Sequence, residues 1–367
     1  MKVEFLVENI ESFLPLLSKT LPAHTQIPVL SNILLEAKGN GFFLYATDLE
    51  LGVRVKIPAK IDEEGSITIP GKQFIEALSS LPKGKVELSL DKDLLTLSSQ
   101  DNKITFNTIV KEEFPSLFEE KGIKIGEFSK NEVEKIFSKV IFAVSLDEAR
   151  PELTGVLLSQ KHKRLDFVAT DGFRLSLKKE EDKALLDDGE TLILSSKLIQ
   201  EVLFSKEEDN MTLYLQKKGN QVLFESKNIL LVGRLINGEF PNYEKVIPSQ
   251  NKTKITFDTE EFLQKIRLSS IFARESANIV KLKIEDKKVK IFAKSSGLGE
   301  GEASLDVEQE GDDNEIAFNV KFLLDLLKNI ESKRTTMEIN SPLESAVFKT
   351  DEDKNFIHII MPVRVQE

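Results

Sequence analysis

The sequence predicts three tandem α+β domains, each with two helices packed on antiparallel sheets. Two observations lead to this prediction. Several short segments recur about 124 residues apart along the chain. Within each repeat, apolar residues switch between helical and strand-like spacing. Three repeats of this length account for the 367 residues. We therefore predict domains at 1–123, 124–248 and 249–367, called below the first, second and third repeats.

The repeat is clearest where the second helix of each domain is expected to begin. Lys72, Lys197 and Lys321 lie 125 and 124 residues apart, and each is followed four residues later by an acid and six residues later by a leucine. An Ala-Thr-Asp segment at 46–48 recurs at 169–171. Landmarks that keep one order and nearly one spacing indicate a tandemly repeated fold.

Each repeat reads as strand, helix, several strands, helix and further strands. In the second repeat, Val133, Ile136, Phe137 and Val140 form one apolar stripe at helical spacing. Glycines at 189, 219 and 238 mark expected turns between strands. Six helical segments are expected, at 7–21, 70–83, 129–145, 195–206, 258–274 and 319–334.

Composition limits the class of protein. An apolar content of 40% and a charged content of 30% are typical of a soluble globular protein. The chain has no cysteine, which excludes disulfides and cysteine-based metal sites or nucleophiles. No apolar run is long enough to span a bilayer, and the N-terminal segment has acidic residues where a secretion signal is apolar. We expect a cytoplasmic protein without a membrane partner.

The charge is unevenly distributed. The net charge of −11 by itself argues against nucleic-acid binding, but the six helical segments together carry +4 and the rest of the chain −15. Lys135 and Lys139 lie opposite the apolar stripe of their helix, and Lys321 and Lys328 lie on the last helix. Two interpretations stay open: a basic surface that faces phosphates, or ordinary solvated helix faces with Glu–Lys pairs.

Catalytic and metal-binding patterns do not occur in the sequence. His24, His162 and His358 lack the spacing of metal ligands, and there is no phosphate-binding glycine loop or nucleophile elbow. Asp48 and Asp171 each follow a predicted strand and precede a turn, where aspartate binds its own backbone. We expect turn residues there rather than paired catalytic carboxylates. The chain is expected not to be an enzyme and to hold no metal or cofactor.

Six blocks of sequence resemble the bacterial DNA sliding clamps, the beta subunits of DNA polymerase III. The blocks keep the family's order along the full chain and include the repeated Ala-Thr-Asp segments and the C-terminal Met-Pro-Val-Arg. They lie at 27–34, 46–50, 150–155, 169–175, 238–248 and 361–364.

The resemblance implies three tandem DNA-clamp domains that assemble head-to-tail with a second copy into a dimeric ring. Helices would line the inside of this ring and sheets the outside. Ile104 and Phe106 of one copy, facing Ile271 and Phe272 of the other, are the apolar residues expected at the dimer contact. An equally open alternative is that these four residues fill the cores of their own domains.

The resemblance also implies partners and their sites. Duplex DNA would be encircled without sequence preference, and a clamp loader would open the ring. A groove between the second and third domains would bind short peptides of the replicative polymerase and other proteins. The expected DNA-facing residues are His24, Lys72, Lys135, Lys139, Lys197, Lys265, Lys321 and Lys328. The expected groove residues are Leu153, Thr170, Gly172, Arg174, Leu175, Pro241, Val246, Asn319, Phe322, Leu343, Met361, Pro362, Val363 and Arg364.

The chain departs from the family pattern at a few positions. Pro151 and Glu152 stand where members often carry aromatic or basic residues that touch DNA, and Glu152 would repel phosphate. His24 stands at a frequent arginine position and Phe173 at a frequent histidine. The last two residues, 366–367, extend past the usual end.

Three hypotheses from different classes follow from the sequence. The first is a processivity factor, a ring that tethers polymerases to DNA by effective concentration. The second is a monomeric repeat adaptor that binds peptides and not DNA, which the net charge and Glu152 favour. The third is an enzyme with an unrecognised site. Retention on circular but not linear DNA distinguishes the ring from both alternatives.

Overall fold

The computed structural model forms two compact units. One unit consists of Met1–Glu134 with Lys197–Leu235, and the other of Lys135–Ser196 with Ile236–Glu367. Every strand pair among the described residues is antiparallel. The structure describes all residues except 117–119, 206–209, 276 and 365–367.

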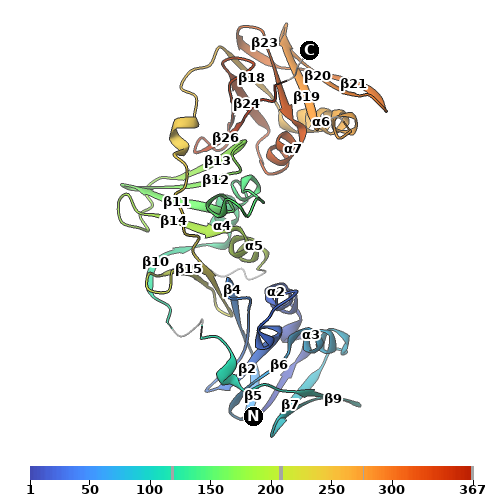
Figure 1. Cartoon of the computed structure of the whole chain (residues 1–367), viewed down its shortest axis with the longest axis vertical. Coiled ribbons are helices and arrows are strands. Elements are labelled where there is room, and N and C mark those ends of the chain that lie inside the picture. Colours follow the sequence, from blue (N-terminus) through green and yellow to red (C-terminus); the bar gives the residue numbers. More distant parts are fainter. Residues whose placement is uncertain (117–119, 206–209, 276, 365–367) are drawn as a thin grey trace. The chain divides into compact units, whose positions relative to one another are not determined.

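The described part of the first unit contains an eight-stranded and a five-stranded sheet (Figure 1). The larger sheet runs, in spatial order, β10 (Ile123–Phe128), β15 (Met211–Gln216), β16 (Gln221–Glu225), β17 (Ile229–Arg234), β4 (Leu51–Ile57), β3 (Gly41–Thr47), β2 (Asn32–Lys38) and β6 (Gly65–Pro70). The smaller sheet runs β5 (Ala59–Glu63), β1 (Lys2–Leu6), β7 (Lys85–Asp91), β8 (Leu94–Ser99) and β9 (Asn102–Asn107).

The described part of the second unit contains a nine-stranded and a four-stranded sheet. The larger sheet runs β14 (Thr191–Ser195), β11 (Gly155–Lys161), β12 (Arg164–Thr170), β13 (Arg174–Glu180), β26 (Phe356–Ile360), β25 (Ala346–Thr350), β24 (Arg334–Ile339), β18 (Thr253–Asp258) and β22 (Glu308–Gly311). The smaller sheet runs β21 (Gly299–Asp306), β20 (Lys288–Ser295), β19 (Ile279–Glu285) and β23 (Asn314–Asn319).

Each large sheet joins strands of two successive repeats. In the first unit, β4 of the first repeat pairs with β17 of the second. In the second unit, β13 of the second repeat pairs with β26 of the third. The two contacts use equivalent strands. The earlier repeat contributes the strand that follows its Ala-Thr-Asp segment, β4 or β13, and the later repeat contributes its last strand, β17 or β26. We call these two contacts the first and second sheet joins.

Two helical segments per repeat are confirmed, with shorter bounds than the sequence suggested. The α-helices are α1 (Val7–Glu11), α2 (Leu14–Thr20), α3 (Gly71–Ser80), α4 (Lys130–Phe137), α5 (Ser196–Phe204), α6 (Thr259–Ala273) and α7 (Val320–Lys328). Short 3₁₀ turns lie at η1 (Pro28–Ser31), η2 (Lys111–Glu113), η3 (Ile141–Ala143), η4 (Pro151–Leu153) and η5 (Tyr243–Val246).

Two of the predicted helices are interrupted. The segment expected at 7–21 is two helices, because Pro15 lacks an N–H and its ring would clash with the carbonyl of Glu11 in a continuous helix. The segment expected at 129–145 leaves the α-helix after Phe137. There the chain tightens into 3₁₀-type bonds, with the N–H of Val140 donating to the Phe137 carbonyl at 3.1 Å.

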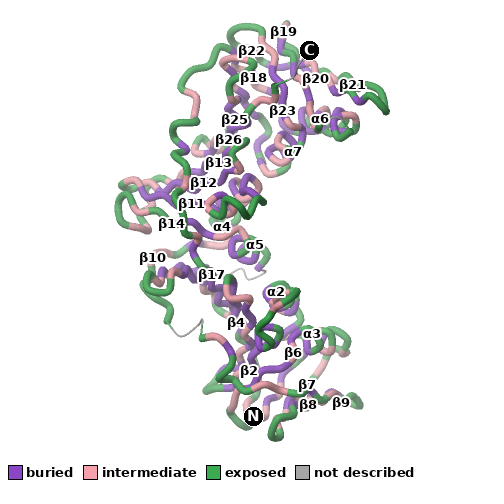
Figure 2. The backbone as a smooth tube through the Cα atoms, in the orientation of Figure 1, coloured by how far each residue is buried: buried purple, intermediate pink, exposed green. Residues whose placement is uncertain are grey.

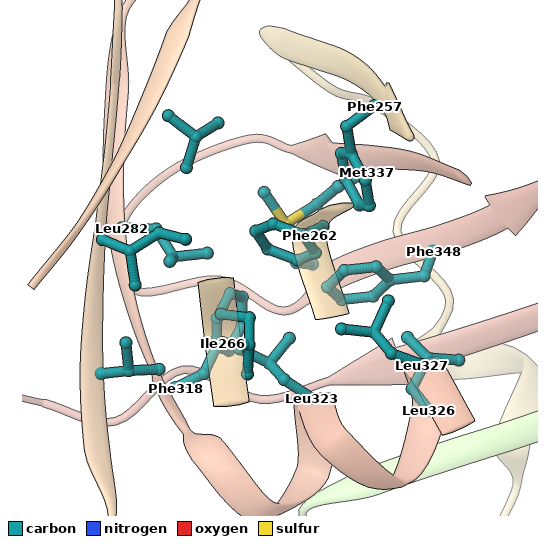
Figure 3. Packing of buried hydrophobic residues seen from close by; sticks show 14 of the residues in the cluster. Phe257, Phe262, Ile266, Leu282, Phe318, Leu323, Leu326, Leu327, Met337 and Phe348 are labelled. Atoms are coloured by element: carbon teal, nitrogen blue, oxygen red, sulfur yellow. The ribbon is translucent and has the colours of Figure 1, made fainter. Parts of the chain in front are cut away.

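Apolar side chains fill the space between helices and sheets. Figure 2 shows buried residues along the inner strands and the inward helix faces. In the third repeat, Phe262 and Ile266 of α6 meet Leu323 and Leu327 of α7 over Phe348 (Figure 3). All five are less than 8% exposed, so this core stabilises the repeat through apolar burial.

The repeated Ala-Thr-Asp segments form side-chain-capped turns, as predicted. Asp48 Oδ1 accepts hydrogen bonds from the backbone N–H groups of Glu50 and Leu51, at 3.0 and 2.7 Å. Asp171 Oδ1 accepts in the same way from Phe173 and Arg174, at 2.9 and 3.0 Å. Asp171 Oδ2 also accepts from the Arg174 guanidinium at 3.1 Å. These aspartates therefore shape the entry into β4 and β13.

A buried histidine lies in the second sheet join. His358 of β26 faces Ser176 of β13, and its Nδ1 lies 2.6 Å from the Ser176 hydroxyl. Its ring lies against that of Phe142 in a tilted arrangement, and its Nε2 has no partner among the described residues. Burial, with Arg174 nearby, lowers the pKa of His358 to about 3, so the ring is neutral at physiological pH.

We predict that Asp171→Ala costs more stability than Asp48→Ala. Loss of the two backbone bonds at Asp48 should lower the free energy of unfolding by about 1–2 kcal/mol. Asp171→Ala also removes a carboxylate from the largely buried guanidinium of Arg174, and should cost roughly 1 kcal/mol more. Urea unfolding of both variants measures the difference. Equal losses would show that the Arg174 pair contributes nothing to stability.

We predict that His358 makes the second unit sensitive to acid. The unfolded chain takes up a proton near pH 6.5, whereas the folded chain excludes it until about pH 3. The stability that depends on neutral His358 is therefore complete above pH 6.5 and is lost as the pH falls below it. His358→Gln should reduce the slope of unfolding free energy against pH by up to about 1.4 kcal/mol per pH unit.

Urea unfolding at several pH values between 6.5 and 4 measures this slope for the wild type and His358→Gln. His24→Gln, at an exposed loop residue, is the matched control and should keep the wild-type slope. Identical slopes for the wild type and His358→Gln would contradict the prediction.

Candidate functional site

A cavity of about 260 Å³ opens in the second unit, next to the second sheet join. Its lining is more apolar than polar in residue type and comes from η4, the turn before β13, the segment around η5 and the end of β26. The lining residues are Arg150, Leu153, Thr170, Gly172, Phe173, Arg174, Leu175, Pro241, Asn242, Tyr243, Val246, Ser345, Ile359 and Met361.

The structure brings eight of the fourteen expected groove residues to this cavity. They are Leu153, Thr170, Gly172, Arg174, Leu175, Pro241, Val246 and Met361. Six lining residues were missed: Arg150, Phe173, Asn242, Tyr243, Ser345 and Ile359. Most of these are neighbours of expected residues in sequence or, for Ile359, across the strand pair. Strand register could have found Ile359, since it pairs directly with Leu175.

The sheet join builds the apolar base of the cavity. Leu175 and Ile359 are register partners on β13 and β26, and both are buried in one apolar cluster with Tyr243. Val246 and Met361 also line the cavity, yet they are 44% and 46% exposed. The cavity therefore combines a buried apolar base with apolar side chains still open to solvent, a combination that suits hydrophobic anchors of a ligand.

A tight turn shapes one wall. Gly172 has φ of 90°, and a Cβ added there would lie 3.2 Å from Arg150 Nη1. Glycine meets both requirements, because it adopts positive φ without strain and leaves room for the guanidinium. The next residue, Phe173, accepts a hydrogen bond on its carbonyl from Met361 N–H at 2.8 Å. That bond holds the C-terminal segment against the turn.

Tyr243 anchors the opposite wall. Its hydroxyl donates to the buried carboxylate of Asp166 at 2.8 Å, and Asp166 is held in turn by the Arg164 guanidinium. Burial, together with this hydrogen bond to Asp166, raises the pKa of Tyr243. The Lys161 ammonium lies 4.8 Å from the ring centroid. These contacts hold Tyr243, itself a lining residue, in place in the cavity wall.

Arg174 is more constrained than the sequence suggested. We expected it to reach a ligand, but its guanidinium binds Asp171 at 3.1 Å and Asp325 at 2.6 Å. It also lies over the rings of Phe322 and Phe142, 4.7 and 5.8 Å from their centroids. Its side chain is only 9% exposed. Arg174 therefore holds the wall of the cavity in shape. Only the part of its guanidinium that the two aspartates do not bind is available to a ligand.

The other six expected residues lie outside the cavity lining. Asn319 caps α7, accepting from the Lys321 N–H at 3.0 Å, and Phe322 packs under Arg174. Leu343 is 64% exposed. In the C-terminal segment, Val363 N–H donates to the carbonyl of Ala317 at 2.8 Å. Pro362 and Val363 are half-buried there and Arg364 is exposed. Residues 366–367 lie outside the described residues.

The expected DNA-facing residues differ in how free their charges are. Lys72, Lys135, Lys321 and Lys328 are exposed and form no ion pair with another described residue. Lys139, by contrast, is ion-paired with Asp353. The two remaining lysines and the histidine are intermediate cases. Lys197 is 61% exposed but binds Glu50 at 2.8 Å, Lys265 is half-buried, and His24 is exposed in a loop.

The four expected dimer residues lie near two sheet edges. Phe106 of β9 is buried against Phe74, with ring centroids 5.9 Å apart, and Ile104 is half-buried. On α6, Ile271 is 55% exposed and Phe272 is half-buried, packed against the core of its own repeat. β9 and β21 are the last strands of their sheets, so each has one unpaired edge among the described strands.

Among the described residues, no group of three histidine, aspartate or glutamate side chains is placed to hold a metal ion. In the same part of the chain, no helix is long and apolar enough to cross a membrane.

Comparison with known families agrees with the threefold repeat. Models of the N-terminal, central and C-terminal domains of the DNA polymerase III beta subunit match residues 2–118, 127–242 and 244–364. The beta sliding clamp of Chlamydia muridarum is 30% identical over 351 residues, covering 95% of this chain and 94% of that protein. The beta sliding clamp of Bacillus subtilis is 28% identical over 98% of this chain and 97% of its own length.

Solved structures show the same fold over the whole length. A DNA polymerase III beta subunit from Thermotoga maritima has a TM-score of 0.89 and 30% identity, with 100% of both chains covered. A DNA polymerase sliding clamp from Bacillus subtilis has a TM-score of 0.92 and 26% identity, again with 100% coverage of both. Since three family models span nearly the entire sequence and full-length relatives share its fold, this chain belongs to the DNA polymerase III beta subunit family, the beta sliding clamps.

Proposed function

We propose that this protein is a non-catalytic processivity factor: a ring of two copies that encircles duplex DNA and tethers the replicative polymerase and other proteins to it. The observation that carries the proposal is that the two sheet joins are built from equivalent strands. The strands equivalent to these in the first and third repeats that pair with no other repeat of the chain are β9 and β21. The proposed place of action is the cytoplasm, and the proposed domains are 1–123, 124–248 and 249–367.

Ring closure follows from repeating the join once more between two copies. In each internal join, the strand after the Ala-Thr-Asp position of one repeat meets the last strand of the next repeat. The third repeat supplies β21 for such a contact, and the first repeat of a second copy supplies β9. Pairing these strands covers two exposed edges, and a head-to-tail contact closes when the rotation per subunit permits it.

Encirclement explains how a protein with a net negative charge can act on DNA. Four exposed lysines on the helices, Lys72, Lys135, Lys321 and Lys328, have charges free to face phosphates. Contacts of this kind are independent of sequence and weaken with salt. A closed ring needs no tight contact, because the topological link alone keeps it on the DNA. The net charge of −11 is therefore compatible with the proposed role.

The cavity beside the second sheet join is the proposed docking site for partner peptides. Its base of Leu153, Leu175 and Ile359 suits leucine or phenylalanine anchors, and the unbranched side chain of Met361 can repack for different partners. Arg150, 44% exposed at the rim, adds a polar contact for the peptide. The proposed partners are the clamp loader, the replicative polymerase and other proteins that carry such peptides.

Ring formation predicts a mass near twice 41.4 kDa in light scattering and retention on circular DNA. Ile271→Asp places a charge on an exposed apolar residue of the proposed contact, so it should fold normally but shift the mass toward one chain. After loading by the clamp loader, wild type should stay on nicked circles and leave linear DNA. A persistent wild-type monomer, or equal loss from circles and linear DNA, would overturn the ring.

Peptide docking predicts that Met361→Asp weakens binding of a fluorescent peptide with leucine and phenylalanine anchors at least about tenfold, because the carboxylate would face apolar anchors. Fluorescence anisotropy measures the affinity. Leu343→Asp, outside the cavity lining, should bind the peptide within about twofold of wild type. Ile271→Asp is a second control. If Leu343→Asp weakens binding as strongly as Met361→Asp, the site extends beyond the cavity.

A further inference from the structure

An acidic residue recurs at one position of the second helix in every repeat. Glu76 on α3, Glu201 on α5 and Asp325 on α7 each lie four residues after the repeated lysine. Two of these three acids bind a cation that belongs to the preceding repeat. The third, Glu76, belongs to the first repeat, which has no preceding repeat in its own chain.

The first of these ion pairs accompanies the first sheet join. Glu201 Oε1 lies 3.5 Å from Lys19 Nζ of α2, and the glutamate side chain is only 9% exposed. The Lys19 ammonium also lies 3.6 Å from the centroid of Phe204, one turn further along α5. Burial raises the pKa of Glu201, against the effect of Lys19. An acid in so buried a place needs its cation, because an unpaired buried charge is strongly destabilising.

The second ion pair accompanies the second sheet join and has the same composition. Asp325 Oδ2 lies 2.6 Å from Arg174 Nη1 of the second repeat. The guanidinium again lies over an aromatic ring of the acid's own helix, Phe322. Each joint between repeats thus combines a pair of strands with one acid from the later repeat, one cation from the earlier repeat and one ring beside that cation. Strand pairing and ion pair occur together both times.

Glu76 is exposed on α3, close to the unpaired strand β9. Helix and strand are linked through Phe74 and Phe106, whose rings meet edge-on at 5.9 Å. Among the described residues, Glu76 has no ion-pair partner. If β9 pairs with a strand of the other copy, helix α3 lies at the same contact. Helices α5 and α7 lie at the two internal joints in the same way.

A cationic face lies beside the other unpaired strand. Helix α6 packs on β20 and β21, and Gly301 of β21 lies directly over Phe272. Arg267, Ile271 and Arg274 are exposed and lie four and three residues apart, which places them on one helix face. Neither arginine side chain has an ion-pair partner among the described residues. Ile271 also has the position in its repeat that Lys19 has in the first. Each lies 14 residues after a phenylalanine, Phe257 or Phe5, that precedes the first residue of the next helix by two positions.

We propose that Glu76 of one copy pairs with the arginines that flank Ile271 on the other copy, Arg267 and Arg274, as the third instance of the ion pair that Glu201 and Asp325 form inside the chain. This inference rests on the proposed two-copy ring and specifies its polar contact. Each internal pair has one largely buried member, whereas both sides of this pair are exposed until the copies meet. Dimer affinity should therefore depend on salt through these residues, while both internal joints stay formed.

Charge reversal tests the pair in the full-length protein. Glu76→Arg should raise the dimer dissociation constant at least about tenfold at low salt, because like charges would face each other across the contact. Arg267→Glu combined with Arg274→Glu should do the same. Mixing the Glu76→Arg variant with the arginine variant should recover association at both contacts, because one contact then has the reversed pair and the other has the wild-type pair. The triple variant should recover most of the wild-type affinity.

Sedimentation across a dilution series, at about 0.1 M and 1 M salt, measures each dissociation constant. Glu239→Arg, at an exposed loop residue, has the same change of charge and should leave the constant within about twofold of wild type. Glu76→Gln, a milder change, should raise the constant roughly threefold and reduce its salt dependence. Circular dichroism confirms that each variant is folded.

The outcomes separate this inference from the proposed function. A wild-type protein that is monomeric throughout the series overturns the ring itself and the pair with it. A dimeric wild type whose affinity is unchanged by Glu76→Arg overturns the pair and leaves the ring standing. Weakening by Glu76→Arg without recovery in the triple variant also overturns the proposed assignment to Arg267 and Arg274.

Discussion

The structure depends on one interaction, the antiparallel pairing of a strand from one repeat with the edge strand of the next. Each repeat by itself would expose unpaired backbone at both ends of its sheets, and such edges favour uncontrolled association. Pairing β4 with β17 and β13 with β26 satisfies these groups inside the chain. The ion pairs Lys19–Glu201 and Arg174–Asp325, each with one largely buried member, accompany the two joins. Strand pairing therefore accounts for the contacts between successive repeats within each unit.

The candidate binding site is a consequence of the second join. Its base exists only because β13 and β26 bring Leu175 and Ile359 into register. The turn before β13 supplies a wall, and Asp171 holds both that turn and Arg174. His358, in the same strand pair, is buried and neutral. A change that weakens this join would therefore alter stability and ligand binding together, whereas a change at the solvent-facing Met361 would alter ligand binding with little effect on stability.

Local patterns predicted the repeated fold because its landmarks are local. The lysine-acid-leucine spacing located α3, α5 and α7, and the Ala-Thr-Asp segments located turns whose aspartates bind adjacent backbone groups. What the sequence could not show are contacts set by tertiary pairing. Lys139 meets Asp353 across 214 residues of chain, and Arg174 meets Asp325 across 151. Neither partner can be read from helical periodicity, so Lys139 was expected to face phosphates and Arg174 to face a ligand.

The differing burial of the three repeated acids has a physical explanation in the number of joints per chain. Three repeats in a line form two internal joints, so two acids pair with cations inside the chain, and the third stays exposed without an ion-pair partner among the described residues. In each internal pair one member is already largely buried in a single chain, whereas both sides of a contact formed by Glu76 must lose water when two copies meet. The joint between copies is therefore the more salt-sensitive one. A proposed ring that has to open and close around DNA would then open at the one joint that the chain itself does not complete.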